Sequence, residues 1–172
     1  DVNLFSTSVT IAGEQLSAKF PNSKNYIDSA TAAYTEKLLE TENYVRSEIS
    51  KIPSNARVLI TAHDAFGYYG RSFGIQVKGI QGISTASDIS IRGITELTDF
   101  IVARSIPSIF VENSVSQKNI NSVIEGCQSK GLNLTIGGTL YSDGLGDTKS
   151  GADTYIKMIR KNTNAIVSGL GR

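Results

Sequence analysis

Apolar side chains recur at intervals of three and four over the first fifty residues, which is the spacing of one face of an α-helix. This spacing predicts a helix that begins near Val2 and ends at Phe20, just before Pro21. It predicts a second helix over residues 27–52, which ends before Pro53. Most charged residues of the second segment lie off its apolar face, so we interpret them as a solvent-facing surface.

After Arg57 the pattern changes to short apolar runs that alternate with helical stretches. The apolar runs predict four buried strands, at residues 58–62, 75–80, 108–112 and 132–136. The stretches between and after them predict helices, at residues 64–74, 89–105, 117–131 and 152–170. We expect Asp64 to cap the first of these helices, and Gly74 and Gly131 to end two of them.

Buried strands joined by helices are typical of a parallel sheet with right-handed crossovers. We therefore predict an α/β fold with a mainly parallel four-stranded sheet flanked by helices. A chain of 172 residues suits one substantial domain or one lobe of a larger protein. Its first residues carry neither an initiator Met nor the regions of a signal peptide, so we expect a processed or excised piece of a gene product.

Composition narrows the classes of function. Lys and Arg number 17 against 16 Asp and Glu, without a basic stripe, so we expect no nucleic-acid partner. The single cysteine, Cys127, excludes an internal disulfide and a cysteine-based zinc knuckle, and we interpret it as a buried or half-buried helix residue. No apolar run approaches the roughly 18 residues of a membrane span.

Three side chains with metal-binding chemistry follow or end the predicted strands. His63 follows the first strand, Glu112 ends the third, and Asp143 lies in the loop after the fourth. Ligands of open α/β sheets bind at the carboxyl ends of the strands, and nitrogen with carboxylate oxygen suits zinc, manganese or iron. Structural roles stay open: a satisfied core histidine, a glutamate capping a turn and an aspartate in a turn.

Enzyme motifs are absent from the sequence. There is no G-x-S-x-G, Walker A or G-x-G-x-x-G segment, and the single histidine excludes H-E-x-x-H. We therefore predict a protein that is not an enzyme and has no catalytic residues. A small hydrolase that uses Ser84 or Ser142 with His63 is a weaker alternative.

Four segments together resemble a known family: "TAHDAFGYYGRSFGI", "KGIQGISTASDIS", "IFVENSV" and "LYSDGLGD", in this order and spacing. They are similar to the carboxyl-terminal lobe of the metal-binding (cluster A-I, TroA-like zinc/manganese) solute-binding proteins of bacterial ABC transporters. The resemblance covers essentially the whole chain. It implies a two-lobed receptor, with an α/β fold in each lobe, a long connecting helix and the ion held between the lobes.

The same resemblance implies roles for individual residues. His63 and Asp143 match two of the four metal ligands, whereas Glu112 and Asp64 are expected to support the ligands without binding the ion. The amino-terminal lobe with its two histidines is absent, so residues 1–20 are expected to be a remnant of the interlobe helix and residues 21–172 the carboxyl-terminal lobe. Half a site is expected to bind metal weakly or not at all, so the isolated fragment can be metal-free.

The resemblance also implies a cargo and partners. The expected cargo is a divalent transition metal, with zinc first, manganese second and iron as a further candidate. The expected partners are the membrane permease of an ABC transporter and the missing amino-terminal lobe. The protein is expected to be exported to the bacterial periplasm or cell surface, with any lipid anchor outside this chain. A surface adhesin of the same family is the alternative function.

Overall fold

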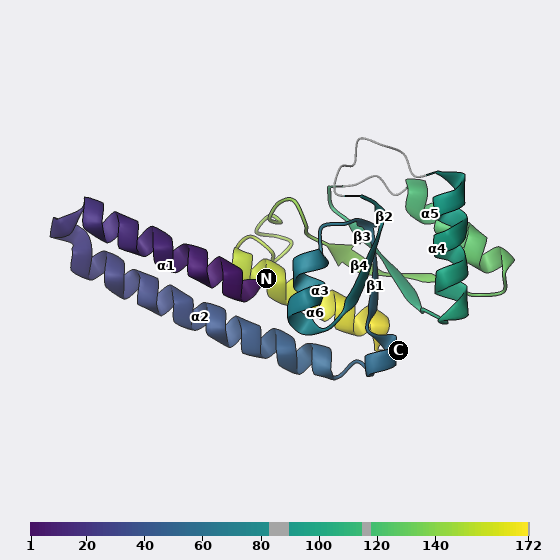
Figure 1. Cartoon of the computed structure of the whole chain (residues 1–172), viewed down its shortest axis with the longest axis horizontal. Coiled ribbons are helices and arrows are strands. Elements are labelled where there is room, and N and C mark those ends of the chain that lie inside the picture. Colours follow the sequence, from purple (N-terminus) through teal and green to yellow (C-terminus); the bar gives the residue numbers. More distant parts are fainter. Residues whose placement is uncertain (83–89, 115–117, 172) are drawn as a thin grey trace. The chain divides into compact units, whose positions relative to one another are not determined.

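The computed structural model describes residues 1–82, 90–114 and 118–171, and it contains two compact units (Figure 1). One unit is Asp1–Ser47 and the other is Glu48–Arg172. The first is helical and the second is a mixed α/β unit. The boundary between the two units lies inside a helix and not near residue 20. The assignment of residues 1–20 to an interlobe helix therefore stays a prediction.

The helical unit is built from α1 (Val2–Lys19), a short 3-10 turn (Pro21–Ser23) and α2 (Lys24–Ser50). These bounds confirm the two predicted helices. The Asp1 side chain accepts a hydrogen bond from the Leu4 N–H and caps α1. The chain turns between the two helices where Pro21 follows Phe20.

Hydrogen bonds join α1 to α2 near both ends of α1. Ser17 Oγ donates to Asp28 Oδ1 over 2.6 Å, and Asn3 Nδ2 donates to Glu42 Oε1 over 2.8 Å. As the residue number rises along α1, the partner's number falls along α2. The two helices therefore form an antiparallel hairpin.

The α/β unit has four strands: β1 (Val58–His63), β2 (Gln76–Gln81), β3 (Ser108–Glu112) and β4 (Thr135–Leu140). β1 pairs with β2 and β3 pairs with β4, in both cases parallel. β1 also lies beside β3, although no ladder of hydrogen bonds joins these two among the described residues. The prediction of four parallel strands is confirmed. In the structure they form two hydrogen-bonded pairs, β1 with β2 and β3 with β4, which lie next to each other.

The last strand begins three residues later and ends four residues later than predicted, and it includes Gly137 and Gly138. The predicted strand ended at residue 136, before these two glycines, and glycine is unfavourable in strands. A Cβ at Gly137 would lie only 2.8 Å from the Phe110 ring, so the glycine lets β4 pass close to that ring. A register irregularity between Ile109 and Phe110 accompanies this close approach.

Four helices accompany the strands: α3 (Gly67–Phe73), α4 (Ile91–Ala103), α5 (Lys118–Ser129) and α6 (Tyr155–Leu170), besides a 3-10 turn at Ser54–Ala56. The prediction that Asp64 caps α3 is wrong, because Phe66 occupies the N-cap position without a side-chain hydrogen bond. Gly74 ends α3 with φ 69°, as predicted, and Gly131 follows α5 with φ 84°.

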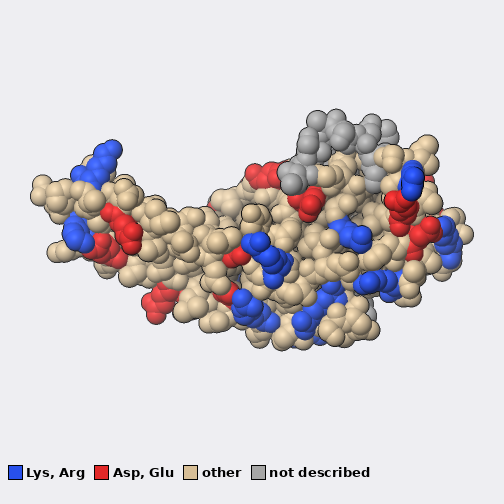
Figure 2. Space-filling model, in the orientation of Figure 1, with Lys and Arg blue, Asp and Glu red and all other residues tan. Residues whose placement is uncertain are grey.

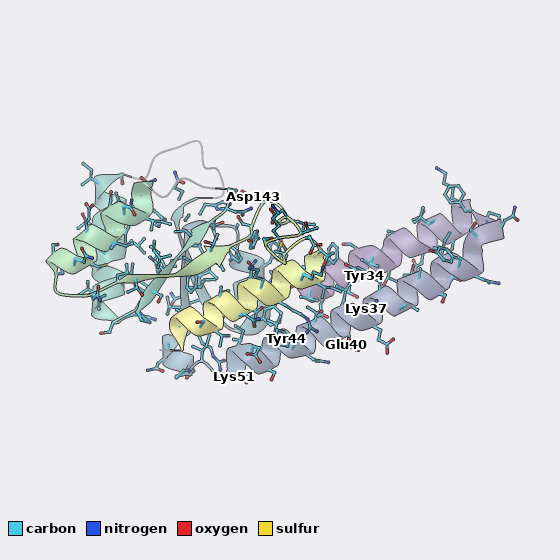
Figure 3. The ribbon with its side chains drawn as sticks, turned by 180° about the vertical axis from the view of Figure 1, so that it is seen from behind. Tyr34, Lys37, Glu40, Tyr44, Lys51 and Asp143 are labelled. Atoms are coloured by element: carbon cyan, nitrogen blue, oxygen red, sulfur yellow. The ribbon has the colours of Figure 1, made fainter. Side chains whose placement is uncertain are left out.

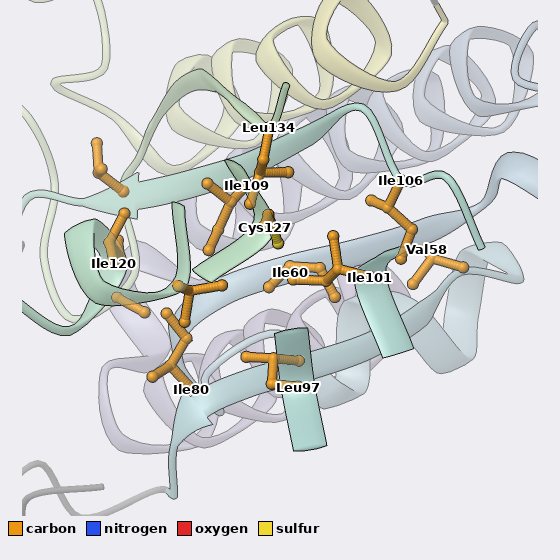
Figure 4. Close-up of a cluster of buried hydrophobic side chains, with 13 residues drawn as sticks. Val58, Ile60, Ile80, Leu97, Ile101, Ile106, Ile109, Ile120, Cys127 and Leu134 are labelled. Atoms are coloured by element: carbon orange, nitrogen blue, oxygen red, sulfur yellow. The ribbon is translucent and has the colours of Figure 1, made fainter. Parts of the chain in front are cut away.

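The helices cover both faces of the strands. On one face, α4 and α5 contribute to a buried apolar cluster with residues of β1, β2 and β3 (Figure 4). The cluster includes Cys127, as predicted, and its described members are Val58, Ile60, Ala62, Ile80, Leu97, Ile101, Ile106, Ile109, Val111, Ile120, Val123, Cys127 and Leu134.

The opposite face of β3 and β4 packs on α6. Ser108 Oγ donates to the Gly169 carbonyl over 2.9 Å, and a Cβ at Gly169 would lie 2.6 Å from Phe110. Because side chains alternate along a strand, Phe110 and Glu112 share this face, as do Thr61 and His63 of β1.

On the surface seen in Figure 2, basic and acidic side chains of the described residues are interspersed.

Candidate metal centre

His63 is the last residue of β1, a strand that is buried along its whole length. Only 3% of His63 is exposed. Its carbonyl accepts hydrogen bonds from Thr61 Oγ1 over 2.8 Å and from the Ala65 N–H over 3.0 Å. The backbone that carries the imidazole is therefore fixed on both sides of the residue.

Glu112, at the end of β3, contacts His63 through both carboxylate oxygens. Oε1 accepts a hydrogen bond from the His63 backbone N–H over 2.9 Å, and Oε2 lies 2.8 Å from the ring atom Nδ1. The second contact is short but is not aligned as a straight hydrogen bond, and neither atom has another hydrogen-bond partner among the described residues. The buried carboxylate therefore faces Nδ1. The other ring nitrogen, Nε2, points away from Glu112.

Asp143 lies in the loop after β4 (Figure 3). Its Oδ1 atom lies 3.4 Å from His63 Nε2, and 56% of its side chain is exposed. The structure thus brings together the three side chains that the strand ends predicted, with Glu112 on one ring nitrogen of His63 and Asp143 on the other. Their roles toward a metal ion stay predictions.

A solvent-open pocket of about 520 Å³ borders this group, and its lining residues are His63, Asp64, Ala65, Gly67, Tyr68, Arg71, Ser142 and Asp143. Asp64 contributes to the wall, but no hydrogen bond or ion pair joins its carboxylate to His63 or Asp143 in the described part of the chain. No contact among the described residues therefore supports the expectation that Asp64 orients a metal ligand.

Asn162 of α6 holds the start of the loop that carries Asp143. Its Oδ1 accepts from the Tyr141 N–H over 2.9 Å, and its Nδ2 donates to the Tyr141 carbonyl over 2.8 Å. Asn162 was not among the site residues predicted from the sequence. The available signal was a polar side chain at a position where the spacing of Ile159 and Ile166 places the apolar face of the helix.

The hydrolase alternative gains no support from the contacts of Ser142. Its hydroxyl lies 3.1 Å from the hydroxyl of Ser114, and no hydrogen bond joins it to His63 within the described ranges. Ser84, the other candidate nucleophile, lies outside the described residues, together with most of the "GISTAS" segment.

The ligand set in this chain is incomplete. Over residues 1–82, 90–114 and 118–171, no group of three or more His, Cys, Asp or Glu side chains has an arrangement that would hold a metal ion. A closed zinc site in a protein normally has four ligands. His63 and Asp143 by themselves supply two.

Comparison with known proteins shows the family of this chain. The model of the family described as zinc-uptake complex component A, periplasmic (ZnuA), matches residues 1–169. The chain belongs to this family. It is 40% identical over 172 residues to the zinc-binding protein TroA of Treponema pallidum, and 44% identical over 156 residues to the manganese-binding lipoprotein MntA of Bacillus subtilis.

A solved structure of the periplasmic zinc-binding protein TroA from Treponema pallidum superimposes with a TM-score of 0.94 at 40% identity, covering 100% of this chain and 62% of that one. The whole chain matches TroA and 91% of it matches MntA, but these matches span 56% and 51% of the two relatives. The chain therefore spans about half the length of the curated relatives that it matches. Among the described helices, none has the length and apolar character needed to cross a membrane.

Proposed function

We propose that this chain is part of the extracytoplasmic substrate-binding component of an ABC importer for a transition metal, and that His63 and Asp143 bind the transported ion. The observation that carries the proposal is the 3.4 Å separation between His63 Nε2 and Asp143 Oδ1. Two ligand atoms that each lie about 2.1 Å from a tetrahedral zinc ion are about 3.4 Å apart. The two side chains thus have the spacing that a shared ion requires.

Glu112 supports this role by its contact with the imidazole. Its carboxylate lies 2.8 Å from Nδ1 and favours a proton on that nitrogen. The lone pair of the neutral ring is then on Nε2, which faces Asp143. The imidazole supplies a nitrogen donor and Asp143 supplies a negative charge, which together suit zinc first, manganese second and iron as a further candidate.

The remaining ligands come, in this proposal, from an amino-terminal lobe outside the chain. The support is the two-ligand set described above and the length of the relatives, of which the chain spans 56% and 51%. The ion is then held between two lobes, and residues 21–172 belong to the carboxyl-terminal one. The chain alone binds metal weakly or not at all, because two ligands replace only part of the water shell of the ion.

Capture and release, with no chemical conversion of the ion, is the activity proposed for the whole protein. It delivers the ion to a membrane permease and works in the periplasm or at the cell surface, attached by a lipid anchor outside this chain or free in the periplasm. The support is the family, described as a periplasmic component of a zinc-uptake complex, and the relatives, a zinc-binding protein and a manganese-binding lipoprotein. No catalytic residues are proposed.

Calorimetric titration of zinc and manganese into the complete encoded protein tests this function. His63→Ala and Asp143→Asn each remove one proposed ligand and are expected to weaken metal binding by at least about 10-fold. Glu36→Gln is the matched control, because it removes one carboxylate charge from an exposed position in the helical unit. Unchanged affinity in His63→Ala would refute the assignment.

A further inference from the structure

Asn162 is a buried polar residue in an apolar part of α6. Only 1% of it is exposed, and Ile159 and Ile166 on the same helix are also buried. Burying an amide costs free energy unless its polar atoms form hydrogen bonds. An aliphatic side chain would fill this position without that requirement, so the amide calls for a specific explanation.

Both polar atoms of the Asn162 amide bind a single residue, Tyr141. The backbone N–H of Tyr141 donates to Oδ1 over 2.9 Å, and its carbonyl accepts from Nδ2 over 2.8 Å. Tyr141 is the first residue after β4. Asn162 therefore continues the hydrogen bonding of the strand by one residue, at the point where the chain leaves the strand for the loop with Asp143.

The chemistry of the amide is needed for this clamp. A backbone unit presents one donor and one acceptor, and an asparagine side chain offers the complementary pair. Aspartate has the same shape, but its ionised carboxylate has only acceptors and would face the Tyr141 carbonyl with a like partial charge. Leucine has similar bulk and forms neither hydrogen bond.

A second fixed point follows the aspartate. The Gly146 N–H donates to the Ala152 carbonyl over 2.9 Å, and a Cβ at Gly146 would lie 2.2 Å from Ser150 Oγ and 2.8 Å from the Tyr141 ring. The chain is thus held at residues 141 and 146. Asp143 lies on the short segment between these points, where consecutive Cα atoms are only about 3.8 Å apart.

We propose that Asn162 is a positioning residue of the metal centre: by holding both backbone groups of Tyr141, it sets where the Asp143 carboxylate lies relative to His63. The inference rests on the proposed function, in which these two side chains bind the ion. In this proposal α6 supplies no ligand. It controls the separation of 3.4 Å between His63 Nε2 and Asp143 Oδ1.

Zinc titration of the complete encoded protein tests the clamp in two variants. Asn162→Asp keeps the shape and loses the donor, whereas Asn162→Leu keeps the bulk and loses both bonds. Each is expected to weaken zinc binding by about 10- to 100-fold, the range found when residues that orient metal ligands are changed. Asn164→Ala, which replaces an exposed asparagine of the same helix, is expected to stay within twofold of wild type.

A second readout separates positioning from general stability. With cobalt(II) at saturating concentration, the visible absorption bands report the geometry around the ion, and both Asn162 variants are expected to change their shape. A role in stability alone would lower the unfolding temperature and leave the bands of the folded, cobalt-loaded protein unchanged. Unchanged bands, or zinc affinity within twofold of wild type in both variants, would overturn the inference.

The His63→Ala protein shows which proposal has failed. If His63→Ala weakens zinc binding and the Asn162 variants do not, the inference is wrong and the proposed function stands. If His63→Ala has no effect either, the proposed function itself is wrong.

Hydrogen exchange of the wild-type protein tests the clamp even if neither variant folds. The Tyr141 amide is expected to exchange at least about 100-fold more slowly than in an unstructured peptide, because its proton is bound to Asn162 Oδ1. Exchange at the peptide rate would show that the clamp does not persist, and would overturn the inference.

Discussion

Glu112 holds His63 at two points across 49 residues of sequence. One carboxylate oxygen accepts from the His63 backbone N–H over 2.9 Å, and the other lies 2.8 Å from the ring atom Nδ1. Both residues are 3% exposed and end neighbouring strands. A single buried side chain therefore contacts both the backbone at the end of β1 and the imidazole ring.

Replacing this carboxylate by an amide is expected to change the state of the imidazole. In Glu112→Gln, an amide N–H₂ that faces Nδ1 moves the ring proton to Nε2, while the opposite amide orientation sets the N–H₂ against the His63 N–H. Zinc affinity of the complete encoded protein is expected to fall about 10- to 100-fold. Nitrogen NMR of the 172-residue chain, which has one histidine, reports the ring tautomer directly.

Glu125→Gln is the control for this substitution, because it makes the same chemical change at an exposed position of α5. Its tautomer and zinc affinity are expected to match wild type. A Glu112→Gln protein with the wild-type tautomer would contradict the orienting role.

The sequence was sufficient for those features of the fold that depend on local pattern. β1 and β3 are continuous apolar runs, and both were predicted to within one residue. The rule that ligands gather at the carboxyl ends of parallel strands then brought His63, Glu112 and Asp143 into one candidate site. Their proximity follows from topology, which the alternation of strands and helices already indicates.

Features that depend on contacts between distant segments were missed. β4 was misplaced because it contains Gly137 and Gly138, which are poor strand residues. Gly137 makes sense only once Phe110 lies against it, and Gly138 lies close to Ala165. Asn162 was missed for the same reason, since its partner Tyr141 is 21 residues away. Neither the space available to a side chain nor the partner of a buried amide can be derived from local periodicity.

The fit between β4 and Phe110 predicts a steric effect of Gly137→Ala. The added Cβ would lie 2.8 Å from two ring atoms of Phe110 and 3.0 Å from Ser108 Cβ, so the buried ring must shift. We expect a loss of about 1–3 kcal/mol in the free energy of unfolding, measured with urea. At Gly82, apart from its chain neighbours, no atom of the described residues lies within 4 Å of an added Cβ, so Gly82→Ala is expected to stay within about 0.5 kcal/mol of wild type. Equal stability of the two variants would contradict the packing argument.

In the helical hairpin, Asp28 is expected to titrate below its ordinary range. The hydrogen bond from Lys24 and then that from Ser17 lower the pKa of its carboxyl group. The ionised form is favoured by folding, so its contribution to stability is present above the unfolded pKa of about 3.9 and is lost as the pH falls through the lower folded pKa.

Carbon NMR of the Asp28 carboxyl group measures this shift. Lys24→Met is expected to raise the pKa of Asp28 toward the ordinary value more than Ser17→Ala does, because the Lys24 contact is the larger cause. Added salt should reduce the Lys24 effect, since that pair is exposed. A larger change in Ser17→Ala would reverse the assigned order.

Cys127 predicts a dependence of stability on alkaline pH. The residue is fully buried in the cluster between the strands, α4 and α5, and burial raises the pKa of its thiol, with the charge of Lys130 opposing part of the increase. The thiol is neutral in both states below the unfolded pKa of about 8.5. Above that pH the unfolded chain loses the proton first, so this contribution to stability declines as the pH rises through the folded pKa.

Urea unfolding of wild type and Cys127→Ala at pH 7, 8.5 and 9.5 isolates this effect, because the other titrating groups are common to both proteins. Wild type is expected to be more stable by about 1 kcal/mol at pH 7, from the packing that alanine loses, and this advantage should shrink toward pH 9.5. A thiol reagent at pH 7 should modify the native protein only as fast as it unfolds. Rapid modification, or an advantage that stays constant as the pH rises, would show that the thiol reaches solvent, contrary to its position in the cluster.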